Sequence, residues 1–119
     1  HVKPHGALYN MAVPGGALAR AIGEAILQVD PATILVALAG SPWADEAERM
    51  GLRVAREAFA DRALNADGTL VPRSKPGSVI HDRQAVIERS VRLVTEGTVV
   101  AVTGETIQVI FAHPSASTR

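Results

Sequence analysis

Apolar residues recur with two different periods along the chain, and the changes of period predict alternating helices and strands. Residues 14–29 predict a helix that lies on a sheet, with Pro14 suited to its first turn. Two i, i+4 rows give this helix an apolar stripe with small residues beside it: Leu18, Ile22 and Ile26, and then Ala17, Ala21 and Ala25. Asp30-Pro31 ends the helix. The unbroken apolar run of residues 33–39 predicts a strand buried on both faces.

The next stretch repeats this alternation. Ser41 and Pro42 have the residue types of an N-cap and a first helical turn, so we expect a helix from there to about Met50. Gly51 is the expected C-cap, and residues 52–59 predict another strand. Strands and helices that alternate through short connections are typical of βαβ units. The sequence therefore predicts an α/β fold with a parallel sheet.

The start of the chain and its middle carry less regular patterns. Pro4 disfavours helix for the residue before it, so residues 1–9 are expected to start extended. Residues 60–81 are rich in turn-forming residues and poor in apolar ones. They predict a long connection without regular structure, and such connections often carry function.

The C-terminal part predicts one more helix and two strands. Asp82 is expected to cap a helix that runs to about Glu96 and ends at Gly97. The inward face of this helix is expected to carry Val86, Ile87, Ser90, Val91 and Val94. Residues 98–103 and 106–111 predict strands joined by a turn at Gly104-Glu105, and the polar tail, residues 113–119, is expected to fray.

Composition and charge narrow the classes of function. The 119 residues, 47% of them apolar, fit a single domain. Twelve basic and twelve acidic side chains give no net charge, which argues against binding to nucleic acid, and no run of basic residues suggests a membrane-surface helix. The longest apolar stretch, residues 33–40, is too short to cross a bilayer. The absence of cysteine excludes a disulfide framework, a thiolate metal site and a cysteine nucleophile.

The first candidate site lies in the opening residues. Lys3 and His5 are two residues apart in an extended segment and are expected on the same face, where they could bind an anion or exchange a proton. Tyr9 and Asn10 are possible hydrogen-bonding partners of a substrate. A solvated edge is the alternative interpretation. Pro4 argues against a helix that would make His1 and His5 a zinc site, and no metal site is predicted.

Two further candidates follow the second strand. Residues 56–62 place four charges at the end of this strand, where parallel α/β folds build their sites. Glu57 or Asp61 could act as a general base there, with Arg62 as an anion clamp. In the loop of residues 67–77, Arg73 and Lys75 flank Ser74 and could hold a phosphate, although the order of a P-loop is missing. The alternatives are a salt-bridged loop and an ordinary solvated loop.

Three stretches taken together resemble one family. Residues 2–10 (Val-Lys-Pro-His-Gly-Ala-Leu-Tyr-Asn) are similar to the central signature of the LamB/YcsF family, which includes the A subunit of bacterial 5-oxoprolinase. Residues 56–62 resemble its second signature, and residues 67–74 with Pro76-Gly77 resemble its third. Three ungapped blocks in the same order make the resemblance specific, and it covers residues 1 to about 110.

The resemblance implies both a fold and an activity. The fold is a distorted (β/α) barrel of the glycoside hydrolase/deacetylase type. The activity is the ATP-dependent opening of 5-oxo-L-proline to L-glutamate in the cytoplasm, together with B and C subunits and with Mg²⁺ expected beside ATP. Under this interpretation Lys3 and His5 serve substrate or phosphate binding and proton transfer, and Glu57 and Asp61 serve as bases. The residues expected to bind substrate or phosphate are Tyr9, Asn10, Arg62, Arg73 and Ser74.

The chain also departs from the family pattern. Family members are longer and begin with an Asp-Leu-Asn-x-Asp-like strand, so we expect residues 1–119 to be the C-terminal part of the barrel, a single partial domain. The Cys-x-His-Gly-Asp-type motif that usually ends the last strand is missing, with His113 as a displaced remnant and a frameshift near Ile110 as one explanation. Half a barrel has open sheet edges, which favour pairing with another chain or a homo-oligomer.

The sequence leaves two other functions open. One is a metal-dependent amide or carbohydrate deacetylase, which would need a His/Asp metal triad. The other is a non-catalytic fragment whose partner completes the barrel.

Overall fold

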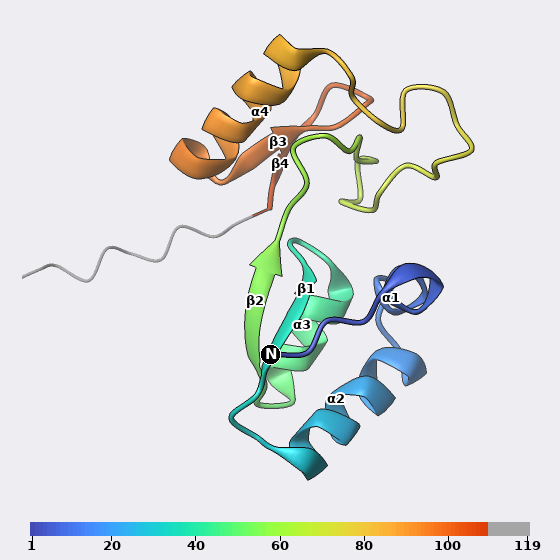
Figure 1. Ribbon diagram of the computed structural model, residues 1–119, viewed down its shortest axis with the longest axis vertical. Helices are drawn as coiled ribbons and strands as arrows, with labels where there is room; N and C mark the ends of the chain where they lie inside the picture. The colour runs from blue at the N-terminus through green and yellow to red at the C-terminus, as the bar shows by residue number, and fades with distance from the viewer. Residues whose placement is uncertain (110–119) are drawn as a thin grey trace, which may run out of the picture. The chain divides into compact units, whose positions relative to one another are not determined.

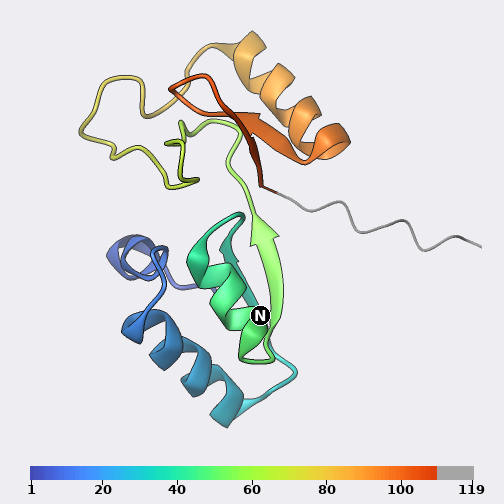
Figure 2. The same ribbon diagram turned by 180° about the vertical axis from the view of Figure 1, so that it is seen from behind.

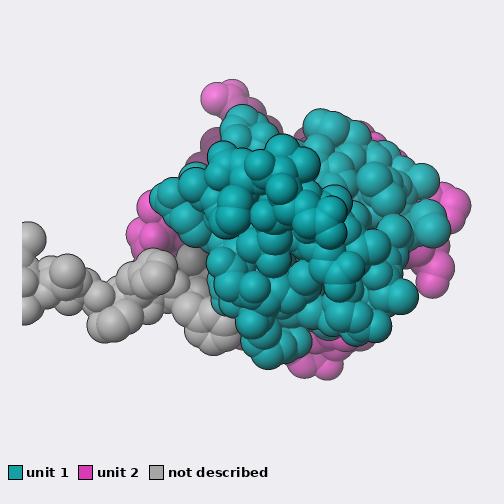
Figure 3. Space-filling model, turned by 90° about the horizontal axis from the view of Figure 1, so that it is seen from below, with its two compact units in different colours: residues 1–57 teal, residues 58–119 magenta. Residues whose placement is uncertain are grey.

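The computed structural model describes residues 1–109, and these form two compact units. The first unit is residues 1–57, and the second begins at Ala58 (Figure 3). The expectation of one partial barrel domain stays a prediction. Figures 1 and 2 show the helices and strands of each unit from opposite sides.

The first unit is built on a parallel pair of strands, as predicted. Strand β1 (Ile34–Leu38) pairs with β2 (Arg53–Glu57) in a register that places Ile34 opposite Arg53 and Leu38 opposite Glu57. The extended start of the chain adds to the other edge of β1. The Val2 N–H donates to the Ile34 carbonyl at 2.8 Å, and the Val36 N–H donates to the Val2 carbonyl at 2.9 Å. The α/β class is therefore confirmed, and three extended segments run parallel.

Helix α2 (Ala17–Val29) confirms the main predicted helix and the inward row of Leu18, Ile22 and Ile26, but it starts later and the small residues beside that row lie on its other side. Pro14 lies outside it, because Gly15 and Gly16 adopt positive φ angles of 80° and 89° that turn the chain before the helix begins. The buried residues are Ala19, Gly23 and Ile26, with Leu18 and Ile22 half-buried. The predicted row of Ala17, Ala21 and Ala25 is exposed. Gly23 accounts for the shift, since the Met50 and Leu52 side chains fill the space beside it.

Two more helices complete this unit, one of them unexpected. Helix α3 (Pro42–Arg49) confirms the prediction, and the Ser41 hydroxyl accepts a hydrogen bond from the Ala44 N–H at 3.1 Å. Helix α1 (Gly6–Ala12) occupies residues that were expected to continue the extended start. Packing explains why this helix forms, because Tyr9 and Ala12 are buried. Burial of one face stabilises a short helix more than its local helix propensity does.

The described residues of the second unit, up to Val109, form one helix and a hairpin. Helix α4 (Arg83–Glu96) is capped by the Asp82 carboxylate, which accepts from the Ala85 N–H at 2.7 Å. Strands β3 (Thr98–Val100) and β4 (Thr106–Gln108) are antiparallel. Strand β3 is shorter than predicted, because the Ala101 N–H donates to the Glu105 carbonyl at 2.8 Å and closes the turn. Residues 110 and 111, the tail and His113 lie outside the described residues.

The predicted inward face of α4 is wrong. None of its residues is buried: Ile87, Val91 and Val94 are exposed, and Val86 and Ser90 are half-buried. Arg89 explains the orientation, because its guanidinium binds three backbone carbonyls, those of Ala60 at 2.9 Å, Arg62 at 2.8 Å and Val100 at 3.2 Å. The helix is held through this arginine, so its aliphatic stripe faces outward.

Candidate functional site

The first and second sequence signatures meet in an ion pair. Lys3 follows the residue that pairs with β1, and Glu57 ends β2, whose register places it opposite Leu38 at the carboxyl end of β1. The Lys3 Nζ lies 2.7 Å from the Glu57 Oε2. Their side chains are 30% and 20% exposed, so the pair is accessible from solvent. Residues 54 positions apart in the sequence are thus joined at one point of the fold.

Two aromatic residues pack beside this pair. The Lys3 Nζ lies 5.9 Å from the ring centroid of Tyr9, within the range of a cation–π interaction. The Tyr9 ring in turn makes an edge contact with Trp43, with centroids 5.3 Å apart and planes at 85°. Tyr9 and Trp43 are both buried. We call the group of Lys3, Tyr9, Trp43 and Glu57 the Lys3–Glu57 cluster.

Several polar atoms of the cluster have unused hydrogen-bonding capacity. The Tyr9 hydroxyl, the Trp43 Nε1 and the Glu57 Oε1 are buried, and each is without a hydrogen-bond partner in residues 1–109. Buried polar atoms are paired in most proteins, because desolvation without a partner costs about 1–3 kcal/mol. Three such atoms among the residues of one cluster make this place the main candidate for binding a polar group.

The environment of Tyr9 keeps its phenol protonated. Burial raises the pKa of Tyr9 far above its usual range, and the nearby negative charge of the Glu57 carboxylate raises it further. The approach of this hydroxyl to the carboxylate falls short of a full hydrogen bond, since neither Tyr9 Oη nor Glu57 Oε1 is satisfied. The cluster thus presents a neutral O–H donor, an ammonium and a carboxylate oxygen, which can together bind a carbonyl and an N–H group and accept a proton.

The other predicted residues of the first unit lie at its surface. His5 is the N-cap residue of α1, and its exposed side chain makes no capping hydrogen bond. Asn10 is exposed on α1 and donates from its side-chain nitrogen to the Gly6 carbonyl at 3.3 Å. Lys3 and Tyr9 are therefore the predicted residues that the structure brings to Glu57.

The remaining predicted residues belong to the second unit. Arg62 holds the loop of its own unit, because its guanidinium donates to the Val71 carbonyl at 2.9 Å and to the Ser78 carbonyl at 3.3 Å. Burial lowers the pKa of Arg62, and the nearby charge of Arg73 lowers it further. Asp61, Arg73 and Ser74 are exposed in the connection between β2 and α4. Arg62 thus has a structural role in the loop, in addition to its predicted role as an anion clamp.

Sequence reasoning missed Trp43. A signal was present: the chain has a single tryptophan, which directly follows the Ser41-Pro42 helix start after a buried strand. Since sites of parallel α/β folds gather at the carboxyl ends of strands, a large aromatic residue there was a candidate. Its contact with Tyr9 depends on α1, which the pattern did not predict.

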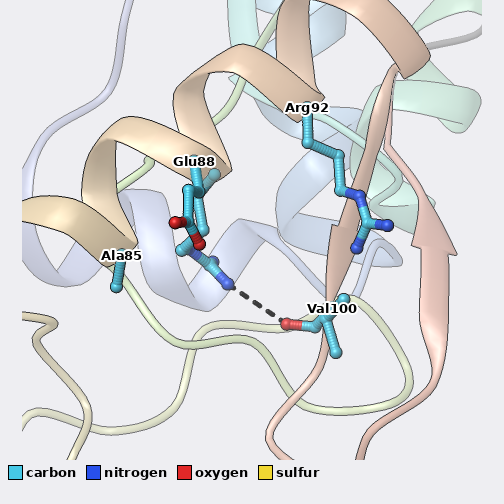
Figure 4. Close-up of a pocket in the computed structure, with 5 residues that line it drawn as sticks. Ala85, Glu88, Arg92 and Val100 are labelled. Atoms are coloured by element: carbon cyan, nitrogen blue, oxygen red, sulfur yellow. Dashed lines mark hydrogen bonds between the residues drawn. The ribbon is translucent and has the colours of Figure 1, made fainter.

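A concave region lies on α4. A cleft of about 360 Å³ is lined by Ala85, Glu88, Arg89, Arg92 and Val100 (Figure 4). The dashed line in Figure 4 is the hydrogen bond from Arg89 to the Val100 carbonyl, and Arg92 pairs with Glu96 at 3.1 Å. Both guanidinium groups are thus engaged within the protein, and the cleft has less free polar capacity than the Lys3–Glu57 cluster.

Two other kinds of feature are absent from residues 1–109. No group of three or more His, Asp or Glu side chains in this range is arranged to hold a metal ion. None of the helices in the same range is long and apolar enough to cross a membrane.

Known proteins match nearly the whole chain. The model of the LamB/YcsF family matches residues 1–114. The chain is 52% identical over 109 residues to the A subunit of 5-oxoprolinase from Alkaliphilus metalliredigens, with 92% of the chain and 43% of that protein covered. It is 56% identical over 108 residues to the A subunit of 5-oxoprolinase from Pyrococcus abyssi, with 91% of the chain and 42% of that protein covered.

A solved structure also matches the chain in its fold. The crystal structure of the lactam utilization protein from Thermus thermophilus matches with a TM-score of 0.80 and 47% identity, over 92% of the chain and 44% of that protein. The chain thus spans less than half the length of the relatives it matches. The three signatures, the joining of the first two at the Lys3–Glu57 pair and these matches lead to one conclusion: the chain belongs to the LamB/YcsF family.

Proposed function

We propose that the chain is part of an A subunit of 5-oxoprolinase, which opens 5-oxo-L-proline to L-glutamate with hydrolysis of ATP, in the cytoplasm and together with B and C subunits. Relatives at 52% and 56% identity over nine-tenths of the chain carry this name, and the word subunit indicates a multi-subunit complex. The observation that carries the proposal is the Lys3–Glu57 cluster, where the signature residues of two separate blocks meet.

The chemistry of the cluster suits the opening of a lactam ring. Water adds to the ring carbonyl carbon, the carbon–nitrogen bond breaks, and the nitrogen leaves as the amine of glutamate. Glu57 takes the proton from the attacking water and passes it to the leaving nitrogen, and Lys3 and Tyr9 donate hydrogen bonds to the carbonyl oxygen as it gains negative charge. His5 and Asp61 are the further residues proposed for proton transfer, and Asn10 is proposed to contact the substrate.

ATP enters as the second substrate, with Mg²⁺ expected beside it. A lactam is very stable, and coupling to ATP supplies the activation that the ring carbonyl needs. The Arg62 guanidinium is engaged with backbone carbonyls of its own loop, which makes it less available to phosphate than Arg73. Arg73 and Ser74, exposed in the loop, are proposed to contact phosphate, and we assign no further step to ATP within this chain.

The proposed fold follows from the share of its relatives' length that the chain covers. We propose that residues 1–119 contribute part of a distorted (β/α) barrel, and that the part of the relatives that the chain does not match supplies the rest. The parallel arrangement of Val2, β1 and β2 supports this proposal, because strands of such a barrel are parallel.

The test is an assay of 5-oxoproline-dependent ATP hydrolysis. The chain is combined with B and C subunits, with and without the unmatched part of the Pyrococcus abyssi relative. We expect ATP hydrolysis that depends on 5-oxoproline when the added part is present, and none with the chain alone. Hydrolysis that is absent in both mixtures, while the complete relative is active with the same B and C subunits, would contradict the proposal.

A further inference from the structure

We propose that Glu57 and Tyr9 recognise a cyclic amide by the edge that carries both its N–H group and its carbonyl oxygen. The Glu57 Oε1 accepts a hydrogen bond from the ring N–H, and the Tyr9 hydroxyl donates one to the ring carbonyl. The inference rests on the proposed function and names the two atoms that would distinguish a lactam from an open-chain amide. It makes Tyr9 a specificity-determining residue.

The unused atoms have the required hydrogen-bonding character. The Glu57 Oε1 is an acceptor, and its partner oxygen Oε2 is already bound to the Lys3 ammonium at 2.7 Å. The Tyr9 hydroxyl can donate a proton, and Tyr9 lies on the same side of the fold as Glu57, because the Lys3 ammonium that binds Glu57 is 5.9 Å from the Tyr9 ring centroid. An acceptor and a donor side by side are complementary to a group that presents an N–H and a carbonyl on the same edge.

Ring size determines which amides have such an edge. A five-membered lactam holds its amide in the cis form, so the N–H and the carbonyl oxygen lie on the same side. An open-chain secondary amide is trans, because the cis form costs about 2.5–4 kcal/mol, and its N–H and carbonyl point in opposite directions. The Glu57–Tyr9 pair therefore satisfies both groups of a lactam and only one group of a chain amide.

The ligand reaches these atoms by displacing part of the Lys3–Glu57 ion pair. Both side chains retain exposed surface, and ion pairs that remain in contact with water contribute only about 0–1 kcal/mol. Opening the pair thus costs little, while the buried oxygens of Tyr9 and Glu57 gain the partners that they lack. Lys3 remains beside the ligand carbonyl as a second donor.

The chain contains its own reporter for this binding. Trp43 is the single tryptophan and Tyr9 the single tyrosine, and their rings are in edge contact at 5.3 Å. A ligand that engages the Tyr9 hydroxyl changes the surroundings of Trp43. Intrinsic tryptophan fluorescence of the complete chain therefore measures affinity without any other protein or ATP.

The experiment compares three ligands of matched size. The first is 5-oxo-L-proline, the second is the corresponding γ-lactone carboxylate, which lacks the N–H, and the third is N-acetyl-L-alanine, an open-chain amide with the same number of carbon atoms. We expect the lactam to bind about ten-fold more tightly than either of the others, since each of these loses one hydrogen bond to the pair. Equal affinity for the lactam and N-acetyl-L-alanine, or no binding of the lactam, would overturn the inference.

Two variants identify the atoms. Tyr9→Phe is expected to weaken lactam binding about ten-fold. Glu57→Gln is expected to bring lactam and lactone affinities close together, because an amide side chain can donate as well as accept. Met11→Leu, exposed on the same helix as Tyr9, is the control and is expected to bind like the parent chain. If Tyr9→Phe binds the lactam with parental affinity, or if Glu57→Gln keeps the parental preference, the assignment is wrong.

Failure of this inference is distinguishable from failure of the proposed function. Selective lactam binding without 5-oxoproline-dependent ATP hydrolysis in the full complex would contradict the function and leave the inference standing. Turnover in the complex with equal binding of cyclic and open-chain amides would contradict the inference and leave the proposed function standing.

Discussion

At the scale of single residues, the Lys3–Glu57 pair is expected to contribute to ligand binding and only little to the stability of the fold. The two side chains are partly exposed, so their attraction is screened by water and contributes little to folding. The groups around them are instead arranged with unmatched donors and acceptors. If the pair belongs to a functional site, we expect its loss to affect ligand binding much more than stability.

Lys3→Met tests this separation. We expect the free energy of unfolding to fall by about 1 kcal/mol or less. In the same variant we expect 5-oxoproline turnover by the complete complex to fall by about 100-fold or more, because the donor to the ring carbonyl is lost. Chemical denaturation and the turnover assay measure the two quantities. A large loss of stability with near-parental turnover would show that Lys3 is structural.

The phenol of Tyr9 gives a prediction about pH. Its pKa is raised in the folded chain, by burial first and by Glu57 second, whereas in the unfolded chain it is about 10. Above that pH the unfolded state loses the proton and the folded state keeps it. Stability is therefore complete below about pH 10 and falls as the pH rises toward the folded-state pKa.

The single tyrosine makes this measurable by the ultraviolet absorbance of the phenolate in the intact chain. We expect Glu57→Gln to move the transition to lower pH, because a negative charge beside the phenol is removed. Tyr9→Phe is expected to reduce the decline in stability above about pH 10. A phenolate transition near pH 10 in the folded parent chain would show that Tyr9 is not buried beside a carboxylate.

At the scale of elements, helix α2 is positioned by a glycine. A Cβ atom at Gly23 would lie 2.8 Å from the Met50 Cε and 3.3 Å from the Leu52 Cδ1. The helix therefore packs closely at this position. The exposed Ala21, on the same helix, offers a matched site without that restriction.

We expect Gly23→Leu to destabilise the chain by about 2 kcal/mol, since the added side chain overfills a packed contact. Ala21→Leu is expected to change stability by no more than about 0.5 kcal/mol. Thermal or chemical denaturation of both variants is the measurement. Similar effects at the two positions would contradict the packing described for α2.

The N-cap of α3 provides a second test at this scale. The buried Ser41 hydroxyl accepts from the Ala44 N–H and donates to the Leu38 carbonyl at 2.7 Å, so it joins β1 to α3. Ser41→Ala is expected to reduce stability by about 1–2 kcal/mol. Asp82→Ala removes the exposed cap of α4 and is expected to cost about 1 kcal/mol or less. A larger loss at Asp82 than at Ser41 would refute this order.

These elements also show what the sequence could and could not predict. Caps and breakers are local, so Ser41-Pro42 and Asp82 marked the starts of two helices correctly. Helix α1 and the exposed stripe of α4 depend on distant partners, the first on burial of Tyr9 and the second on the carbonyls that bind Arg89. Lys3 and Glu57 were predicted from spacing, from the end of a strand and from the family resemblance, but their contact with each other and the contact of Tyr9 with Trp43 follow from tertiary structure alone.

At the scale of the whole molecule, unpaired surfaces are the main feature. In the described part of the chain, β2 pairs only with β1. A groove of about 210 Å³ lined by Val2, Ala25, Ile26, Val29 and Thr33 is apolar, and Val29 is almost fully exposed. The chain also spans less than half the length of its relatives. Such edges and apolar surfaces favour association with another polypeptide.

We therefore expect the isolated chain to be inactive and to be oligomeric or poorly soluble. Light scattering coupled to size-exclusion chromatography over a range of concentrations is the measurement. Val29→Lys combined with Val94→Lys is expected to reduce the apparent mass, and Thr106→Lys, also exposed, is the control. A monomer at every concentration, with a single cooperative unfolding transition and turnover of 5-oxoproline, would contradict this expectation.

The central claim is that the Lys3–Glu57 cluster opens a lactam. Its most direct test is the formation of L-glutamate from 5-oxo-L-proline and ATP by the reconstituted complex, with the parent chain and with Glu57→Gln. We predict glutamate formation by the parent and a loss of about 100-fold or more in the variant, with assembly of the complex unchanged. Glutamate formation by Glu57→Gln at the rate of the parent would contradict the account.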